Sequence, residues 1–141
     1  MRIGFTGTQV GMTAEQKRIF TGIVQAFIGK LVEFHHGDCI GADEQAHNIL
    51  FWLRDKHECN LEIHVHPPEN SSKRAWKLGD MTHKAKPYLD RNKDIVDSCD
   101  FMVAISRTGT EELRSGTWST IRYARKMSVP CLVISPNGNF L

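Results

Sequence analysis

The sequence lacks a strong excess of charge of either sign. Eighteen Lys and Arg residues stand against sixteen Asp and Glu residues, so the formal net charge is +2. Proteins that bind nucleic acid or an anionic membrane through a basic surface usually carry a clear positive excess. The charge balance therefore argues against nucleic acid as the main partner.

Long apolar runs are also missing. No stretch approaches the ~20 consecutive apolar residues that a helix needs to cross a bilayer. The first residues, MRIGFTGT, are typical of a strand and do not form a basic segment followed by an apolar one, so no secretory signal is expected. We therefore expect a cytoplasmic protein without a membrane partner.

Cysteine is sparse and widely spaced. The four cysteines, Cys39, Cys59, Cys99 and Cys131, fit neither a CxxC zinc motif nor a dense disulfide framework. We expect them to be reduced, partly buried thiols. The length of 141 residues is close to the ~150 of one domain, and with no linker or repeat we expect a single domain over residues 1–141.

Short apolar runs alternate with longer segments of helical periodicity, a pattern typical of a parallel sheet with crossover helices. Strands are expected at residues 2–6, 31–35, 61–65, 101–106 and 131–135. Helices are expected at residues 13–29, where Thr13 and Gln16 predict a capping box, and at 42–57, 88–98 and 115–127. The predicted fold class is α/β: a Rossmann-like three-layer sandwich with a mostly parallel five-stranded sheet and helices on both faces.

Residues 67–87 form a polar segment with few periodic features. Lys73, Arg74 and Trp76 within it suggest a lid whose indole stacks on a base while the cations meet phosphate. A solvated segment with one docked aromatic explains the same residues equally well. Both alternatives stay open at this level.

Segments rich in Gly, Ser and Thr follow three predicted strands, at residues 7–11, 36–43 and 107–110, the last of which leads to residues 115–120. Each alone is also typical of a tight turn or a capped helix start. Together they fall at one edge of the sheet, where free N–H groups and helix N-termini bind anions and glycine permits close approach. The sequence therefore predicts a phosphate or nucleotide site formed by Gly7, Thr8, Gln9, His36, Gly37, Asp38, Gly41, Ala42, Asp43, Ser115, Gly116, Thr117 and Trp118.

Three motifs resemble the SLOG superfamily: HGDCIGAD at 36–43, RNKDIVDSCDF at 91–101 and RSGTWSTIRYA at 114–124. That superfamily includes the DprA-like proteins, the LOG-type phosphoribohydrolases and domains proposed to sense nucleotide signals. The resemblance covers nearly the whole chain. It implies a Rossmann-like fold, often dimeric, that binds a nucleotide or nucleotide-sugar with its phosphate at the Gly116–Thr117 turn. It also implies that Arg91 and Asn92 take part in binding.

One position departs from the hydrolytic members, which carry a PGGxGTxxE pattern. Aligned on Gly116 and Thr117, the glutamate position falls on Thr120, and the residues before the turn lack Pro-Gly-Gly. A threonine cannot supply the carboxylate that such hydrolysis uses. Another carboxylate remains an alternative, and the candidates are Glu111, Glu112, Asp94 and Asp43.

Seven histidines invite a metal interpretation, since His64 and His66 would share one face of a strand. No HExxH or paired Cys/His spacing accompanies them, so we expect no metal site. We expect the imidazoles instead to line the ligand edge of the sheet or to lie at strand ends, from where His36 and His66 can donate hydrogen bonds to phosphate. Trp118 either forms a wall of the site or joins the core.

The sequence thus favours a nucleotide-binding protein, acting as a sensor, carrier or sequestering protein, without a cofactor and forming a homo-oligomer. One alternative is an N-glycosidase, of phosphoribohydrolase or deoxyribosyltransferase type, that uses a carboxylate elsewhere. A second alternative is single-stranded DNA binding, as in the DprA-like proteins.

Overall fold

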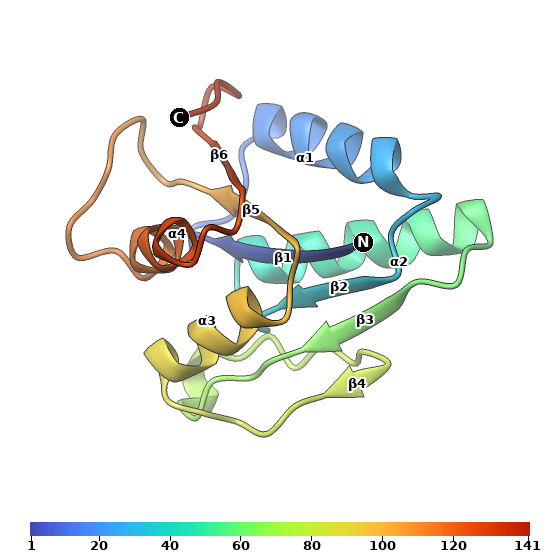
Figure 1. The fold of residues 1–141 in the computed structure, drawn as a ribbon, viewed down its shortest axis with the longest axis horizontal. Coiled ribbons are helices and arrows are strands. Elements are labelled where there is room, and N and C mark those ends of the chain that lie inside the picture. The colour runs from blue at the N-terminus through green and yellow to red at the C-terminus, as the bar shows by residue number, and fades with distance from the viewer.

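The computed structural model describes residues 1–141 and contains one six-stranded sheet in the order β4-β3-β2-β1-β5-β6 (Figure 1). Every neighbouring pair of strands is parallel. The strands are β1 (Arg2–Gly7), β2 (Glu33–His36), β3 (Glu62–Val65), β4 (Met81–Thr82), β5 (Phe101–Ile105) and β6 (Cys131–Ile134). The Rossmann-like α/β fold is confirmed, with a correction: β4 is a sixth strand. Its two residues are too short for a periodic signal.

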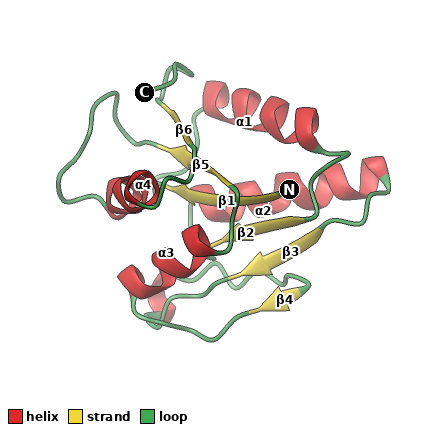
Figure 2. Ribbon diagram, viewed as in Figure 1, coloured by secondary structure: helices red, strands yellow, loops and turns green.

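Helices cover both faces of the sheet and complete three layers (Figure 2). They are α1 (Ala14–Phe27), α2 (Ala42–His57), α3 (Tyr88–Asp97) and α4 (Gly116–Lys126). The first two pack on one face and the last two on the other (Figure 1). None of the four is long and apolar enough to cross a membrane.

The larger core lies between the sheet and the first two helices. Phe5, Phe20 and Phe34 are fully buried there, and their ring centroids lie 5.2–6.1 Å apart. On the opposite face Met102 packs among residues of α3 and α4, while the buried Trp118 packs with Ala104. Successive residues of a strand point to opposite faces, so each buried strand contributes to both cores.

The predicted capping box at the start of α1 is confirmed. Thr13 Oγ1 accepts a hydrogen bond from the Gln16 amide at 3.1 Å, and Gln16 Oε1 accepts one from the Thr13 amide at 2.9 Å. The Gln16 side chain also donates to the carbonyl oxygens of Ser106 and Ile134 at 2.8 and 3.0 Å. The cap therefore fixes α1 to the carboxyl ends of β5 and β6.

The strand order reverses at β1, which has β2 on one side and β5 on the other. In open α/β sheets, the loops that follow the two neighbouring strands at such a reversal, here β1 and β5, run to opposite faces of the sheet. They leave a crevice at the carboxyl ends of those strands. The fold thus places the β1–α1 turn and the β5–α4 loop, seen as the wide orange loop in Figure 1, on either side of this position.

Candidate functional site

A cleft of about 720 Å³ opens at the carboxyl ends of β1 and β5. Three segments form its walls: the β1–α1 turn, the end of the β5–α4 loop with the start of α4, and the first residue of α3. The lining residues are Gly7, Thr8, Gln9, Val10, Tyr88, Arg107, Glu112, Leu113, Arg114, Ser115, Gly116 and Thr117.

The N-terminus of α4 forms one wall. Ser115 caps the helix, its Oγ accepting a hydrogen bond from the Trp118 amide at 3.2 Å. The amides of Gly116 and Thr117 have no partner within the helix, because the first N–H groups of a helix have no carbonyl one turn before them. A Cβ on Gly116 would lie 3.0 Å from the Tyr88 ring, so glycine lets the helix start lie against that ring.

The β1–α1 turn forms the opposite wall and is held by backbone contacts. The Thr8 amide donates to the carbonyl of Ile105 at 3.2 Å, and the Thr8 carbonyl accepts from the Ala42 amide at 3.0 Å. Gly41 has a φ of 93°, and a Cβ there would lie 2.3 Å from the Gln9 carbonyl oxygen. Gly41 and Ala42, both predicted as binding residues, therefore fix the shape of the turn through their backbone and do not line the cleft.

Charge at the cleft comes from three side chains of the β5–α4 loop. Arg107 and Glu112 form an ion pair at 2.6 Å. Arg114 is exposed and forms no ion pair. The cleft therefore carries a net positive charge and one carboxylate, that of Glu112.

A second, much smaller cavity lies beneath the cleft and shares Gly7, Tyr88, Gly116 and Thr117 with it. Four predicted site residues line this lower cavity and not the cleft: Gly37, Asp43, Arg91 and Asn92.

Arg91 is buried and its hydrogen bonds go to protein groups. Its guanidinium donates to the carbonyl oxygens of Gly37 and His66, the latter at 2.9 Å, and to Asn92 Oδ1 at 2.8 Å. Arg91 therefore joins α3 to the ends of β2 and β3.

Asp43 is the buried carboxylate of the lower cavity. Its Oδ2 accepts a hydrogen bond from the Cys39 amide at 3.1 Å, while its Oδ1 has no partner. Burial raises the pKa of this carboxyl to about 6, although the positive charge of Arg91 acts to lower it. A buried acceptor without a partner is uncommon and points to a group that takes part in binding or catalysis.

Six of the predicted residues line the cleft: Gly7, Thr8, Gln9, Ser115, Gly116 and Thr117. Three others do not line the cleft: His36 and Asp38, which corrects the prediction, and Trp118, for which the core was one of the two alternatives. His36 is fully buried, with Nε2 2.9 Å from His47 Nδ1 and Nδ1 accepting from the Asp38 amide. Asp38 is fully buried and binds Arg74. The Trp118 indole lies in the core and donates to Ser106 Oγ at 3.2 Å.

His66 also differs from its prediction. Its Nε2 lies 2.8 Å from His35 Nδ1 within a group of histidines, and it does not line the cleft. Neither His36 nor His66 is therefore placed to donate to a phosphate in the cleft.

Six lining residues were not among the predicted binding residues, although Glu112 was named as a candidate carboxylate: Val10, Tyr88, Arg107, Glu112, Leu113 and Arg114. Arg107 and Glu112 lie in or beside segments that the sequence singled out, but spacing did not show which side chains would face the cleft. Tyr88 begins the helix that carries Arg91 and Asn92, but it precedes the motif at 91–101 that pointed to those two residues.

The candidate carboxylates are separated by the structure. Asp94 pairs with Lys86 at 2.5 Å and Glu111 with Arg122 at 3.7 Å, and neither lines the cleft. Thr120, at the position of the LOG glutamate, donates its hydroxyl to the Gly116 carbonyl at 2.9 Å. Only Glu112 in the cleft and Asp43 beneath it remain close to a ligand placed there.

The polar segment around Trp76 packs on the β2–α2 loop. Asp38 accepts hydrogen bonds from Arg74 Nε at 2.7 Å and from the Lys77 amide at 2.9 Å. The guanidinium of Arg74 lies 3.9 Å from the centre of the Trp76 ring, which is 61% exposed. None of these side chains lines the cleft, so the lid does not cover it in this structure.

No family model and no curated protein matches the chain. Two solved structures resemble it in fold. TM1055, a structural genomics target, superposes with a TM-score of 0.66 over 98% of this chain and 76% of its own, at 13% identity. DNA processing protein A from Helicobacter pylori, described for its single-stranded DNA binding mode, gives a TM-score of 0.65 over 94% of this chain, at 15% identity. The chain spans 64% of that protein's length.

Both likenesses confirm the predicted Rossmann-like α/β fold. The resemblance of the three motifs to the SLOG superfamily stays a prediction. At 13–15% identity the likeness carries the fold alone.

Proposed function

We propose that the protein binds a nucleotide or a nucleotide-derived ligand, with a phosphate group between the β1–α1 turn and the start of α4. The free amides of Gly116 and Thr117 and the positive end of the helix dipole suit an anion. Arg107 and Arg114 add positive charge beside them. The observation that carries the proposal is the convergence of these features on one cleft at the reversal of strand order.

The cleft also has room for more than a phosphate. Its volume of about 720 Å³ lies within the range of small-molecule sites, ~300–1,000 Å³. The Tyr88 ring at its edge offers an aromatic surface of the kind on which nucleobases stack. A nucleoside moiety fits the remaining space better than a simple anion does.

Binding without hydrolysis is the favoured role. The position of the LOG glutamate is Thr120, whose hydroxyl is engaged by the helix backbone. On this account the protein acts as a sensor, carrier or sequestering protein for its nucleotide.

The second candidate is an N-glycosidase, and the position of Glu112 favours it. Glu112 is the only carboxylate lining the cleft, and a carboxylate is the group that glycosidic cleavage uses as acid, base or nucleophile. Glu112 forms an ion pair with Arg107 at 2.6 Å.

One experiment separates the two candidates. The purified protein is denatured, released small molecules are identified by mass spectrometry, and the recovered nucleotide or a nucleotide panel is incubated with fresh protein. Recovery of intact nucleotide supports binding. Release of free base, abolished by Glu112→Gln and kept by Glu111→Gln, supports the glycosidase. No bound nucleotide and no thermal stabilisation by the panel would contradict both.

Single-stranded DNA binding is tested beside them with an oligonucleotide. Affinity that falls steeply with salt, as counterion release requires, and that exceeds the affinity for mononucleotides would replace the nucleotide proposal.

A further inference from the structure

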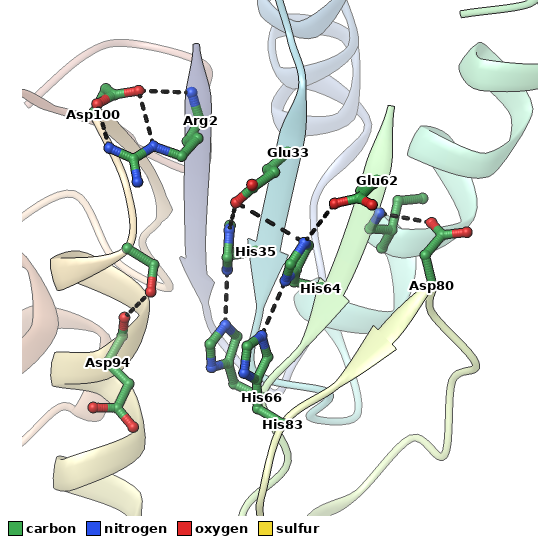
Figure 3. Close-up of polar contacts among 12 residues, drawn as sticks. Arg2, Glu33, His35, Glu62, His64, His66, Asp80, His83, Asp94 and Asp100 are labelled. Atoms are coloured by element: carbon green, nitrogen blue, oxygen red, sulfur yellow. Dashed lines mark hydrogen bonds and ion pairs between the residues drawn. The ribbon is translucent and has the colours of Figure 1, made fainter. Parts of the chain in front are cut away.

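Four histidines meet on the sheet face that carries α3, outside the cleft (Figure 3). His35 in β2 and His64 in β3 are neighbours in the strand register. His66 and His83 follow two residues further along β3 and β4, on the same face because side chains alternate along a strand. His35, His64 and His66 are buried, and His83 is partly exposed.

The rings form two stacked pairs and two hydrogen-bonded pairs. Ring centroids lie 4.3 Å apart for His35 and His64, and 4.1 Å apart for His66 and His83. Across these stacks, His35 Nδ1 lies 2.8 Å from His66 Nε2, and His64 Nδ1 lies 3.0 Å from His83 Nε2. His35, His64 and His83 thus each bring one ligand nitrogen to within 4.8 Å of the other two, and His66 lies beside them through its contact with His35.

Two carboxylates orient the outer nitrogens. Glu33 Oε1 lies 2.8 Å from His35 Nε2, and Glu62 Oε1 lies 3.3 Å from His64 Nε2 (Figure 3). A carboxylate accepts hydrogen bonds, so these contacts place the proton on Nε2 of each ring and leave Nδ1 as a lone pair facing inward. The arrangement of carboxylate, histidine and inward lone pair is the one that supports metal-bound histidine in proteins.

We propose that His35, His64, His66 and His83 bind one divalent transition-metal ion of the Zn²⁺ type, with Glu33 and Glu62 as supporting hydrogen-bond acceptors. Nitrogen ligands of a tetrahedral Zn²⁺ lie about 3.3 Å apart, given Zn–N distances of about 2.0–2.1 Å. The ligand atoms of His35, His64 and His83 already lie within 4.8 Å of one another. Binding needs small ring movements and transfer of the His66 and His83 protons from Nε2 to Nδ1.

The ligand set indicates the type of site. Four imidazole nitrogens suit Zn²⁺, Cu²⁺ or Ni²⁺ and disfavour Mg²⁺ or Ca²⁺, which prefer oxygen. Four protein ligands leave no position open for a substrate, as in structural zinc sites. The ion would hold the two-residue strand β4 to β3 and β2. It would reach the site from solvent beside His83, which is partly exposed.

The test uses the tag-free full chain after treatment with a chelator. Zn²⁺ is titrated in competition with a chromophoric chelator, and Co²⁺ is added separately to record its visible spectrum. The proposal predicts one tightly bound Zn²⁺ per chain, an intense tetrahedral Co²⁺ spectrum and a higher Tm with Zn²⁺. His83→Ala should abolish all three, Glu62→Gln should weaken Zn²⁺ binding about 10–100-fold, and the control His57→Ala should change nothing.

A measurement on the unmodified chain guards against misfolded variants. Long-range ¹H–¹⁵N spectra of the histidine rings should show Zn²⁺ shifting the ring nitrogens of the four cluster residues, while those of His36, His47 and His57 stay in place. Absence of stoichiometric binding, wild-type affinity in His83→Ala, or shifts confined to histidines outside the cluster would overturn the proposal. The four imidazoles would then be a hydrogen-bonded group only.

Discussion

Arg91 Nη1 donates a hydrogen bond to the carbonyl oxygen of His66 over 2.9 Å, and this bond joins α3 to the end of β3. The same nitrogen also donates to the carbonyl of Gly37, at the end of β2. One buried guanidinium thus lies between the cavity under the cleft and the histidine cluster. It maintains the relative positions of the elements that form both.

Replacing this guanidinium should destabilise the fold strongly. Arg91→Met leaves two buried carbonyl oxygens without their donor, and we expect a loss of about 2–4 kcal/mol in the free energy of unfolding. Urea denaturation monitored by circular dichroism measures it. Lys93→Met, at an exposed position of the same helix, is the control. Equal midpoints for the two variants would contradict the role given to Arg91.

Gly41 and Gly22 should respond to the same substitution with opposite signs. At Gly41, alanine meets a φ of 93° and a carbonyl oxygen 2.3 Å from the new Cβ, so we expect a loss of at least about 1–3 kcal/mol. At Gly22, exposed within α1, nothing lies within 4 Å of a Cβ, and alanine should stabilise by about 0.5–1 kcal/mol. Thermal denaturation gives both values, and a tolerated Gly41→Ala would show that the turn relaxes freely.

Asp43 should make stability depend on pH. Its folded pKa of about 6 exceeds the ordinary value of 3.8, so the folded state binds more protons than the unfolded state between those values. Stability from this group therefore falls as pH rises from about 4 to about 6 and then stays constant, with a total cost of up to about 3 kcal/mol.

Asp43→Asn removes this titration. The stability of the variant relative to wild type should therefore increase from pH 4 to pH 6 and level off above pH 6.5, as measured by urea denaturation across the range. Asp55→Asn, on the exposed side of the same helix, supplies the baseline. A difference between Asp43→Asn and wild type that does not change with pH would rule out the raised pKa.

Arg114 should contribute to nucleotide affinity without contributing to stability. It is exposed, unpaired and beside the free amides of α4, so Arg114→Gln should weaken nucleotide binding about 5–10-fold and leave the Tm unchanged. Lys126→Gln removes the same charge at the far end of α4 and should leave affinity at the wild-type value. Isothermal titration calorimetry measures the nucleotide affinity of both variants. Equal losses of affinity in the two would indicate a general effect of charge and contradict a specific role for Arg114.

Features set by local chemistry were predictable from the sequence. The capping box of Thr13 and Gln16 needs only residues three apart, and α2 begins and ends where periodicity placed it, at Ala42–His57. The alternation of strands and helices gave the layer order and the edge of the sheet at which the cleft lies.

Features that depend on the direction of a side chain, or on pairing between residues distant in the sequence, were not predictable from the sequence. His36 and Asp38 lie in the predicted binding segment, yet the local backbone turns both into the interior, Asp38 with a φ of 55°. His83 reaches the histidine cluster only because β4 joins the sheet. A strand of two residues is too short to show the alternation of apolar and polar residues that predicts a strand. The pairing of His35 with His64 follows from the cross-strand register, which motif spacing along the chain does not show.

The central claim is that a phosphate-bearing nucleotide binds between the β1–α1 turn and the start of α4. The most direct measurement is a ¹H–¹⁵N NMR titration of the uniformly labelled chain with AMP, ADP and ADP-ribose as probes. The account predicts saturable shifts of the backbone amides of Gly7, Thr8, Gly116 and Thr117 with at least one probe. Amides that do not move, or shifts confined to another surface, would contradict it.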